Sequence, residues 1–229
     1  MTARRRRTHR WVPWSGVGAV VGAALWTAMP WLQLAALGTR PYVATVYDVV
    51  ASVGWLLMIV GLAGVHSTFR SRYGRLGRVG VWTTAVGMGL VAAVLGRSVA
   101  AFLAAGLRAV PAIGEDPAGL VVTFVTALGL SLTVAGASVL GVALRRLDPR
   151  TSATTVLLVA GSVVPVLTVA LRHLSLLPLP LGRLLVRTNL VLVPFGIGWM
   201  ALGRLVWHVS RHAESSRERR RRSERTGGE

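Results

Sequence analysis

Residues 43–65 read VATVYDVVASVGWLLMIVGLAGV and contain a single charged side chain, Asp48. A helix rises about 1.5 Å per residue, so this segment is long enough to cross about 30 Å of hydrocarbon. Its apolar residues do not alternate with polar ones, which argues against a membrane β-strand. Five further stretches share this length and character, at residues 12–38, 79–103, 120–144, 151–171 and 188–209. The sequence therefore predicts an all-α fold, a polytopic membrane bundle of six transmembrane helices.

The composition of the chain agrees with a single membrane domain. Of its 229 residues, 53% are hydrophobic and only 15% are charged, and the charges concentrate between and outside the apolar stretches. No segment outside these stretches is long enough to fold alone. We expect a transmembrane domain over residues 12–209, a basic N-terminal tail over residues 1–11 and a basic, disordered C-terminal tail over residues 210–229.

The basic residues predict the partner. A formal net charge of +18 raises the question of nucleic acid. Here the arginines flank apolar spans, so the predicted partners are the lipid bilayer and anionic lipid head groups at the cytoplasmic face, not nucleic acid. A protein partner or a homo-oligomer stays open. The chain has no cysteine, which excludes disulfides, thiolate metal sites and cysteine catalysis.

The placement of arginine predicts the orientation. With both termini in the cytoplasm, the inner side holds both tails and the loops with Arg70 to Arg78 and Arg145 to Arg150, whereas the outer side holds five arginines, Arg40, Arg108, Arg172, Arg183 and Arg187. Positive residues favour the cytoplasmic side, so the sequence predicts an integral protein of the cell membrane. A cleaved signal is the alternative for the first stretch, and it would leave five spans. That stretch is long and lacks a clear cleavage site, which favours an uncleaved span.

Small residues predict how the helices associate, because in lipid they let two backbones approach closely. The three stretches that run from outside to inside each carry two glycines seven residues apart, which lie on one helix face. This spacing raises the hypothesis of three related helical hairpins, although chance matches are easy in a glycine-rich chain. Internal packing is favoured over homodimerisation. The candidate packing glycines are Gly18, Gly22, Gly54, Gly61, Gly89, Gly96, Gly129, Gly136, Gly196 and Gly203.

Three charged residues fall inside the predicted spans: Arg204, near the inner end of the sixth, can reach the head groups, whereas Asp48 and Arg97 lie at similar depth. Asp48 lies near the outer end of the second span and Arg97 near the outer end of the third. Consecutive antiparallel spans are neighbours, and pairing lowers the cost of charge at membrane depth. We therefore predict an Asp48–Arg97 ion pair. It would be a clasp between helices or part of a gate or substrate path; the alternative is that each side chain reaches the interface separately.

Two prolines are candidate helix kinks. Pro165 falls midway along the fifth predicted span and Pro194 early in the sixth. A proline inside a helix frees a backbone carbonyl and bends the helix, and transporters use such breaks at substrate sites. Isolated prolines are also ordinary in membrane helices, which is the favoured interpretation.

The motifs of common enzymes are absent from the sequence. It contains no phosphate-binding loop, no HExxH zinc motif and no GxSxG nucleophile elbow, and we predict no catalytic residue, cofactor or metal. The first hypothesis is a non-catalytic membrane protein that acts through packing, partners or lipid. The alternative is a small-solute or ion transporter with Asp48 and Arg97 near its path, and a membrane enzyme ranks last.

Overall fold

A computed structural model describes residues 11–35, 42–106, 118–147, 151, 153–161, 163 and 193–226. Within these ranges the chain is helical and contains no strand, so the predicted all-α fold is confirmed for them. The long helices are α1 (Trp11–Ala35), α2 (Tyr42–Phe69), α3 (Gly74–Ala104), α4 (Ala118–Arg145) and α7 (Val193–Thr226).

Four helices are long and apolar enough to cross a membrane. By length and composition, these candidate spans are Trp11–Trp31, Val49–Phe69, Gly74–Ala104 and Phe124–Arg145. They overlap the first four predicted spans. The fifth predicted span is described only in part, and the predicted start of the sixth at residue 188 lies outside the described residues. The described residues therefore support four of the six predicted spans.

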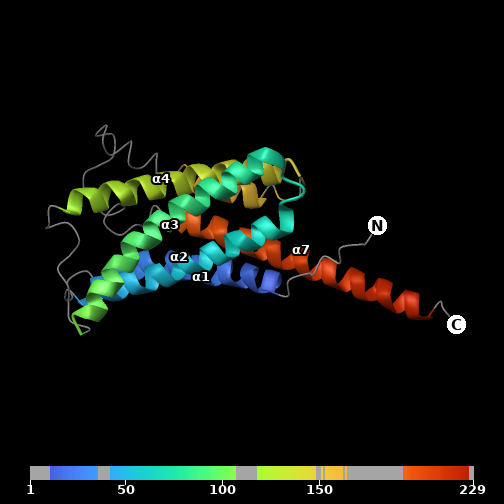
Figure 1. Ribbon diagram of the computed structural model, residues 1–229, viewed down its shortest axis with the longest axis horizontal. Helices are drawn as coiled ribbons and strands as arrows, with labels where there is room; N and C mark the ends of the chain where they lie inside the picture. Colours follow the sequence, from blue (N-terminus) through green and yellow to red (C-terminus); the bar gives the residue numbers. More distant parts are fainter. Residues whose placement is uncertain are drawn as a thin grey trace, which may run out of the picture.

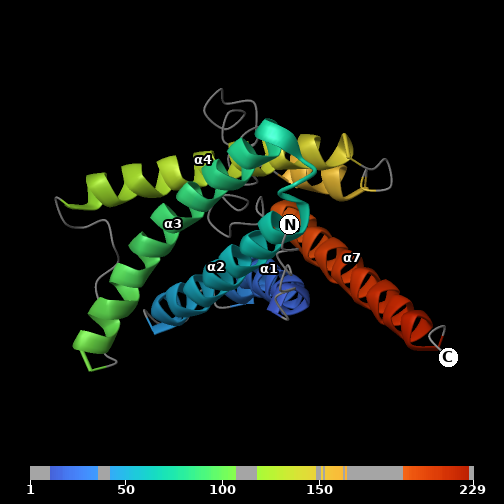
Figure 2. The same ribbon diagram turned by 45° about the vertical axis from the view of Figure 1, so that its right-hand side comes forward.

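The helices pack in two connected groups (Figures 1 and 2). Helix α1 packs against both α2 and α7, and α3 packs along α4. Helix α2 also packs against α3 and thereby joins the two groups. The interior of the first group holds large side chains that are fully buried, among them Trp55, Met58 and Trp199. The rings of Trp26 and Trp55 meet edge to face with centroids 5.1 Å apart, which fills the space between α1 and α2.

A short turn at residues 70–73 connects α2 to α3, and glycine makes it feasible. Gly74 has a φ of +62°, in the left-handed region that side chains other than glycine rarely adopt. The ring of Tyr73 lies directly against Gly77, where any Cβ would overlap it. Tyr73 is consequently buried within an otherwise basic, exposed turn.

Helix α7 is longer than the apolar pattern predicts. The predicted span ends at residue 209, but the helix continues to Thr226 and projects beyond the other helices (Figure 1). The extension is rich in Arg and Glu, both of which have high helix propensity. Helix formation therefore continues past the point where hydrophobicity ends, into residues for which the sequence predicts a disordered tail.

Candidate functional site

Glycine contacts hold α1 against α2. A Cβ placed on Gly22 would lie 2.6 Å from the carbonyl oxygen of Gly54, and one placed on Gly54 would lie 3.1 Å from the carbonyl oxygen of Gly22. Gly61 lies further along α2, and the side chain of Ala19 on α1 fills the space where its Cβ would be. Gly18 is less constrained, since its nearest neighbour would be 3.5 Å from an added Cβ. Of the four candidate glycines on these helices, Gly22 and Gly61 thus lie where a larger residue has no room, and Gly54 lies where it would be tightly packed.

Helices α3 and α4 contact each other through small residues that have the same spacing on both helices. Gly80, Thr84 and Gly87 on α3 repeat the pattern of Gly129, Thr133 and Gly136 on α4. An added Cβ on Gly87 would lie 2.5 Å from the carbonyl oxygen of Gly129, and one on Gly136 would lie 2.8 Å from that of Gly80. The same motif therefore faces itself across an antiparallel pair of helices.

The two threonines of this motif hydrogen-bond to the backbone of their own helices. Thr84 Oγ1 donates to the carbonyl oxygen of Gly80 at 2.7 Å, and Thr133 Oγ1 donates to that of Gly129 at 2.8 Å. Both side chains are buried. Because each hydroxyl bonds within its own helix, the polar atoms cost little at an apolar interface, and the two backbones can come close.

The glycines of α3 that make this contact are not the ones that the sequence singled out. Gly89 and Gly96 are exposed, and no other described residue lies within 4 Å of an added Cβ on either. They lie on a different face of α3 from Gly80 and Gly87, which are buried against α4. Both faces of a lipid-embedded helix are apolar, so composition alone does not separate them.

The third pair of spaced glycines, on α7, contacts α1. Gly196 abuts Thr27, and an added Cβ on Gly203 would lie 2.6 Å from the carbonyl oxygen of Gly16. In α2 and α4 the paired glycines instead contact the helix that precedes each of them in the chain. The three pairs thus share spacing without sharing the same kind of partner, and related hairpins remain a hypothesis.

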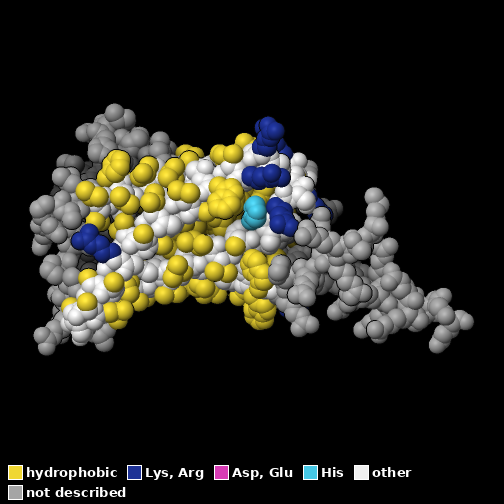
Figure 3. All heavy atoms as spheres, viewed as in Figure 1, with side chains coloured by type: hydrophobic (Ala, Val, Ile, Leu, Met, Phe, Trp, Pro, Cys, Tyr) yellow, Lys and Arg dark blue, Asp and Glu magenta, His cyan; other side chains and the backbone are white. Residues whose placement is uncertain are grey.

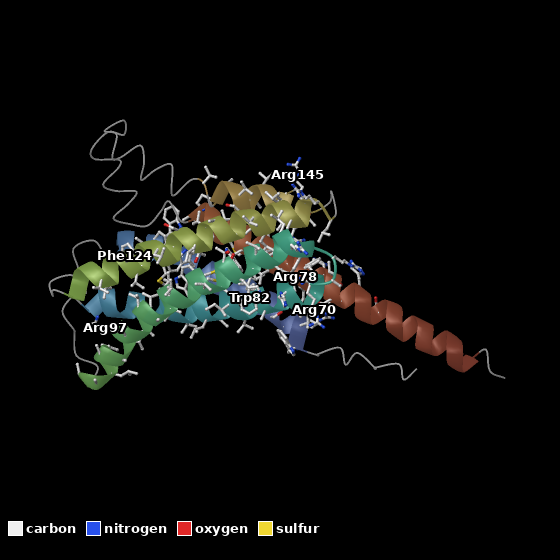
Figure 4. The ribbon with its side chains drawn as sticks, turned by 45° about the horizontal axis from the view of Figure 1, so that its top comes forward. Arg70, Arg78, Trp82, Arg97, Phe124 and Arg145 are labelled. Carbon is white, nitrogen blue, oxygen red and sulfur yellow. The ribbon has the colours of Figure 1, made fainter. Side chains whose placement is uncertain are left out.

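The other candidate residues are placed as follows. Asp48 lies in α2, but its side chain is outside the described part, so the predicted ion pair stays a prediction. Arg97 is exposed on α3, at the end of the molecule opposite Arg70 and Arg78 (Figure 4). Pro194 is the second residue of α7 and sits beside Gly161. Pro165 lies outside the described residues.

Arginines and aromatic residues gather at the end of the bundle where α2 and α4 end and α3 begins. Figure 3 shows hydrophobic side chains over the middle of one face, with arginines toward both ends and a histidine beside those nearer α7. Arg70, Arg78 and Arg145 lie at this same end (Figure 4). We call this surface the basic end; its exposed arginines are Arg70, Arg72, Arg75, Arg78, Arg145 and Arg146.

A histidine, a tyrosine and a tryptophan form a small cluster within the basic end. His66 lies in the last turn of α2, and its Nδ1 is hydrogen-bonded to the hydroxyl of Tyr73. The ring of His66 also meets Trp82 of α3 edge to face, with centroids 6.4 Å apart. Trp82 is 64% exposed, so one side of the cluster lies on the protein surface.

The Tyr73 hydroxyl stays protonated in this setting. Burial raises the pKa of the Tyr73 phenol above its ordinary value of 10.0, and the positive charges of Arg78 and Arg70 oppose that rise without cancelling it. A protonated phenol can donate to His66 Nδ1. This cluster is absent from the sequence-based predictions, because it depends on the turn that brings His66 and Tyr73 together.

These observations define a class of protein. The described chain is an all-helical protein with several helices apolar enough for an integral membrane protein, and no group of three or more His, Asp or Glu side chains that could hold a metal occurs among its described residues. Comparison of the chain with protein-family models, curated proteins and solved structures found no match.

Proposed function

We propose that the protein is a non-catalytic, six-span protein of the cell membrane, with both termini in the cytoplasm, that acts through its cytoplasmic basic end by binding anionic lipid. The observation that carries the proposal is the basic end itself. Six exposed arginines and an exposed tryptophan border helices with apolar outward surfaces. Arginine and tryptophan at the ends of apolar helices are typical of the membrane interface.

The strength of such an interaction is consistent with the proposal. Each arginine near an anionic surface contributes about 1 kcal/mol of attraction, and this attraction falls off within a Debye length. Several arginines on one surface therefore give a preference for anionic over zwitterionic lipid. A protein partner or a second copy would be an additional partner and is not needed for this preference.

Purification with native lipid tests the proposal. The lipids that remain bound to the detergent-solubilised protein would be quantified by mass spectrometry and compared with the bulk membrane. We expect anionic phospholipids to be enriched, and the enrichment to fall when Arg70, Arg72, Arg75 and Arg78 are replaced by glutamine. Bound lipids with the composition of the bulk membrane would contradict the proposal.

The transporter alternative is less well supported. It rests on Asp48 and Arg97 lining a polar path, but Arg97 is exposed on α3. Protein-dependent uptake or release of labelled solutes by proteoliposomes would support this alternative.

A further inference from the structure

We infer that the turn between α2 and α3 forms a binding site for one anionic phospholipid, in which His66, Arg70 and Arg78 hold the phosphate and the outer surface of α3 holds an acyl chain. The inference rests on the proposed function and names the place on the basic end where lipid is bound.

The hydrogen bond to Tyr73 determines what His66 offers to a ligand. The Tyr73 hydroxyl is hydrogen-bonded to Nδ1 of His66, and it is the donor in the imidazole tautomer that carries its hydrogen on Nε2. In that tautomer, Nε2 can donate to a ligand. The His66 side chain is half-buried beside the surface residue Trp82. A phosphate oxygen is an acceptor only, which matches this donor.

Two arginines follow His66 in the chain, one before and one after Tyr73. Arg70 follows the last turn of α2, Arg78 lies in the second turn of α3, and both are exposed. The backbone N–H of Arg70 donates to the carbonyl oxygen of His66 at 2.9 Å, and Arg78 directly follows Gly77, against which the Tyr73 ring lies. Guanidinium groups bind phosphate oxygens through paired hydrogen bonds, and a phosphodiester offers oxygens for more than one of them.

The surface beside these cations is apolar, and this favours a lipid over other anions. Val79, Trp82 and Val86 are 58%, 64% and 54% exposed. They recur at helical spacing along one face of α3, leading from the arginines toward the middle of the helix. An inorganic phosphate or an acidic protein segment would use the cations but not this stripe. A phospholipid matches both, with its head group at the turn and an acyl chain along the helix.

The chain offers a matched control for charge. Arg145 and Arg146 belong to the same basic end, but they come from α4. The variant R145Q/R146Q therefore loses the same charge as R70Q/R78Q while leaving His66, Tyr73 and Trp82 with their neighbours. General attraction to an anionic surface responds to both variants alike, whereas a local site responds to only one.

Native mass spectrometry of the full-length, detergent-solubilised protein titrated with phosphatidylglycerol or phosphatidylcholine tests the site. We expect a preference for phosphatidylglycerol that R70Q/R78Q lowers about 10- to 30-fold, as about 1 kcal/mol per arginine implies, and that R145Q/R146Q lowers less than about 3-fold. Equal losses in the two variants, or none in R70Q/R78Q, would overturn the site. In that case a wild-type preference for phosphatidylglycerol leaves the proposed function standing, whereas no wild-type preference contradicts both.

Two further measurements identify the ligand, and the first uses a variant that should keep the fold. W82L changes an exposed residue, so the fold should persist while the affinity for phosphatidylglycerol drops about 3- to 10-fold, since roughly 1 kcal/mol of apolar contact is lost. An unchanged affinity in W82L would contradict the acyl-chain part of the site. Inorganic phosphate in millimolar excess should not displace the lipid, and displacement would show that the site binds free phosphate.

Discussion

Gly22 of α1 and Gly54 of α2 lie so close together that a Cβ on either one would press against the backbone carbonyl oxygen of the other. A Cβ on Gly22 would come within 2.6 Å of the Gly54 carbonyl oxygen. The obstacle is backbone, which cannot rotate away as a flexible side chain can. Close backbone approach of this kind is a main source of helix association in lipid, where hydrophobic burial is not a driving force.

Replacing Gly22 with alanine should therefore destabilise the protein by about 1–3 kcal/mol, the usual cost of overpacking. Gly18→Ala is the matched control, because its Cβ would meet only an ordinary contact at 3.5 Å. The measurement is the temperature at which half of the detergent-solubilised protein remains monodisperse. Equal midpoints for the two variants would contradict the close packing of α1 and α2.

The contact between α3 and α4 makes a second prediction, with a control only two residues away. Gly87→Ala places a Cβ against the backbone of Gly129 and Thr133, whereas Gly89 is exposed. We expect Gly87→Ala to lower the midpoint clearly. Gly89→Ala should leave it unchanged or raise it slightly, because alanine has the higher helix propensity. The reverse order would mean that α3 presents a different face to α4.

These two helices show what the sequence could and could not predict. The first four apolar stretches lie within a few residues of α1 to α4, because length and composition alone decide whether a helix can cross a membrane. The face that each helix turns inward was harder to predict. Gly80 and Gly87 were missed in favour of Gly89 and Gly96, since the buried and the lipid-facing sides of such a helix are both apolar. The pattern shared with α4 identifies the correct face only once the two helices are compared.

The candidate site was predictable only in part. Arginine placement predicted which end of the helices is basic, because charge is confined to the ends of membrane spans. The His66–Tyr73 hydrogen bond depends on the turn at Gly74 and on the space left by Gly77. Such a contact is created by backbone geometry rather than by composition, so no pattern in the sequence signals it.

Tyr73 gives a prediction in alkaline solution. The folded state raises the pKa of its phenol above 10.0, so the folded protein holds this proton more tightly than the unfolded chain. This contribution to stability is complete below pH 10.0 and is lost as pH rises through the folded pKa. The midpoint of the wild type should fall above about pH 10, and Tyr73→Phe should fall less steeply over the same range. Parallel curves for both proteins would contradict the burial of the phenol.

The predicted Asp48–Arg97 pair can be tested by a double-mutant cycle. If the two side chains interact, Asp48→Asn and Arg97→Gln together should cost less than the sum of the single changes, by about 0.5 kcal/mol or more. The free energy of unfolding in mixed micelles supplies the four values. If the two single changes in the free energy of unfolding simply add, the two side chains do not interact, and the main argument for a polar path is lost.

The measurement that tests the account most directly is the side of the membrane on which the two ends of α3 lie. The chain has no cysteine, so a single cysteine can be placed at Ser71, in the turn of the basic end, or at Ala105, just past the opposite end of α3. Each would be labelled with a membrane-impermeant maleimide in right-side-out and in inside-out vesicles. We predict labelling of S71C only in inside-out vesicles and of A105C only in right-side-out vesicles. Labelling of both positions from the same side would contradict a membrane-spanning α3, and exchanged labelling would contradict a cytoplasmic basic end.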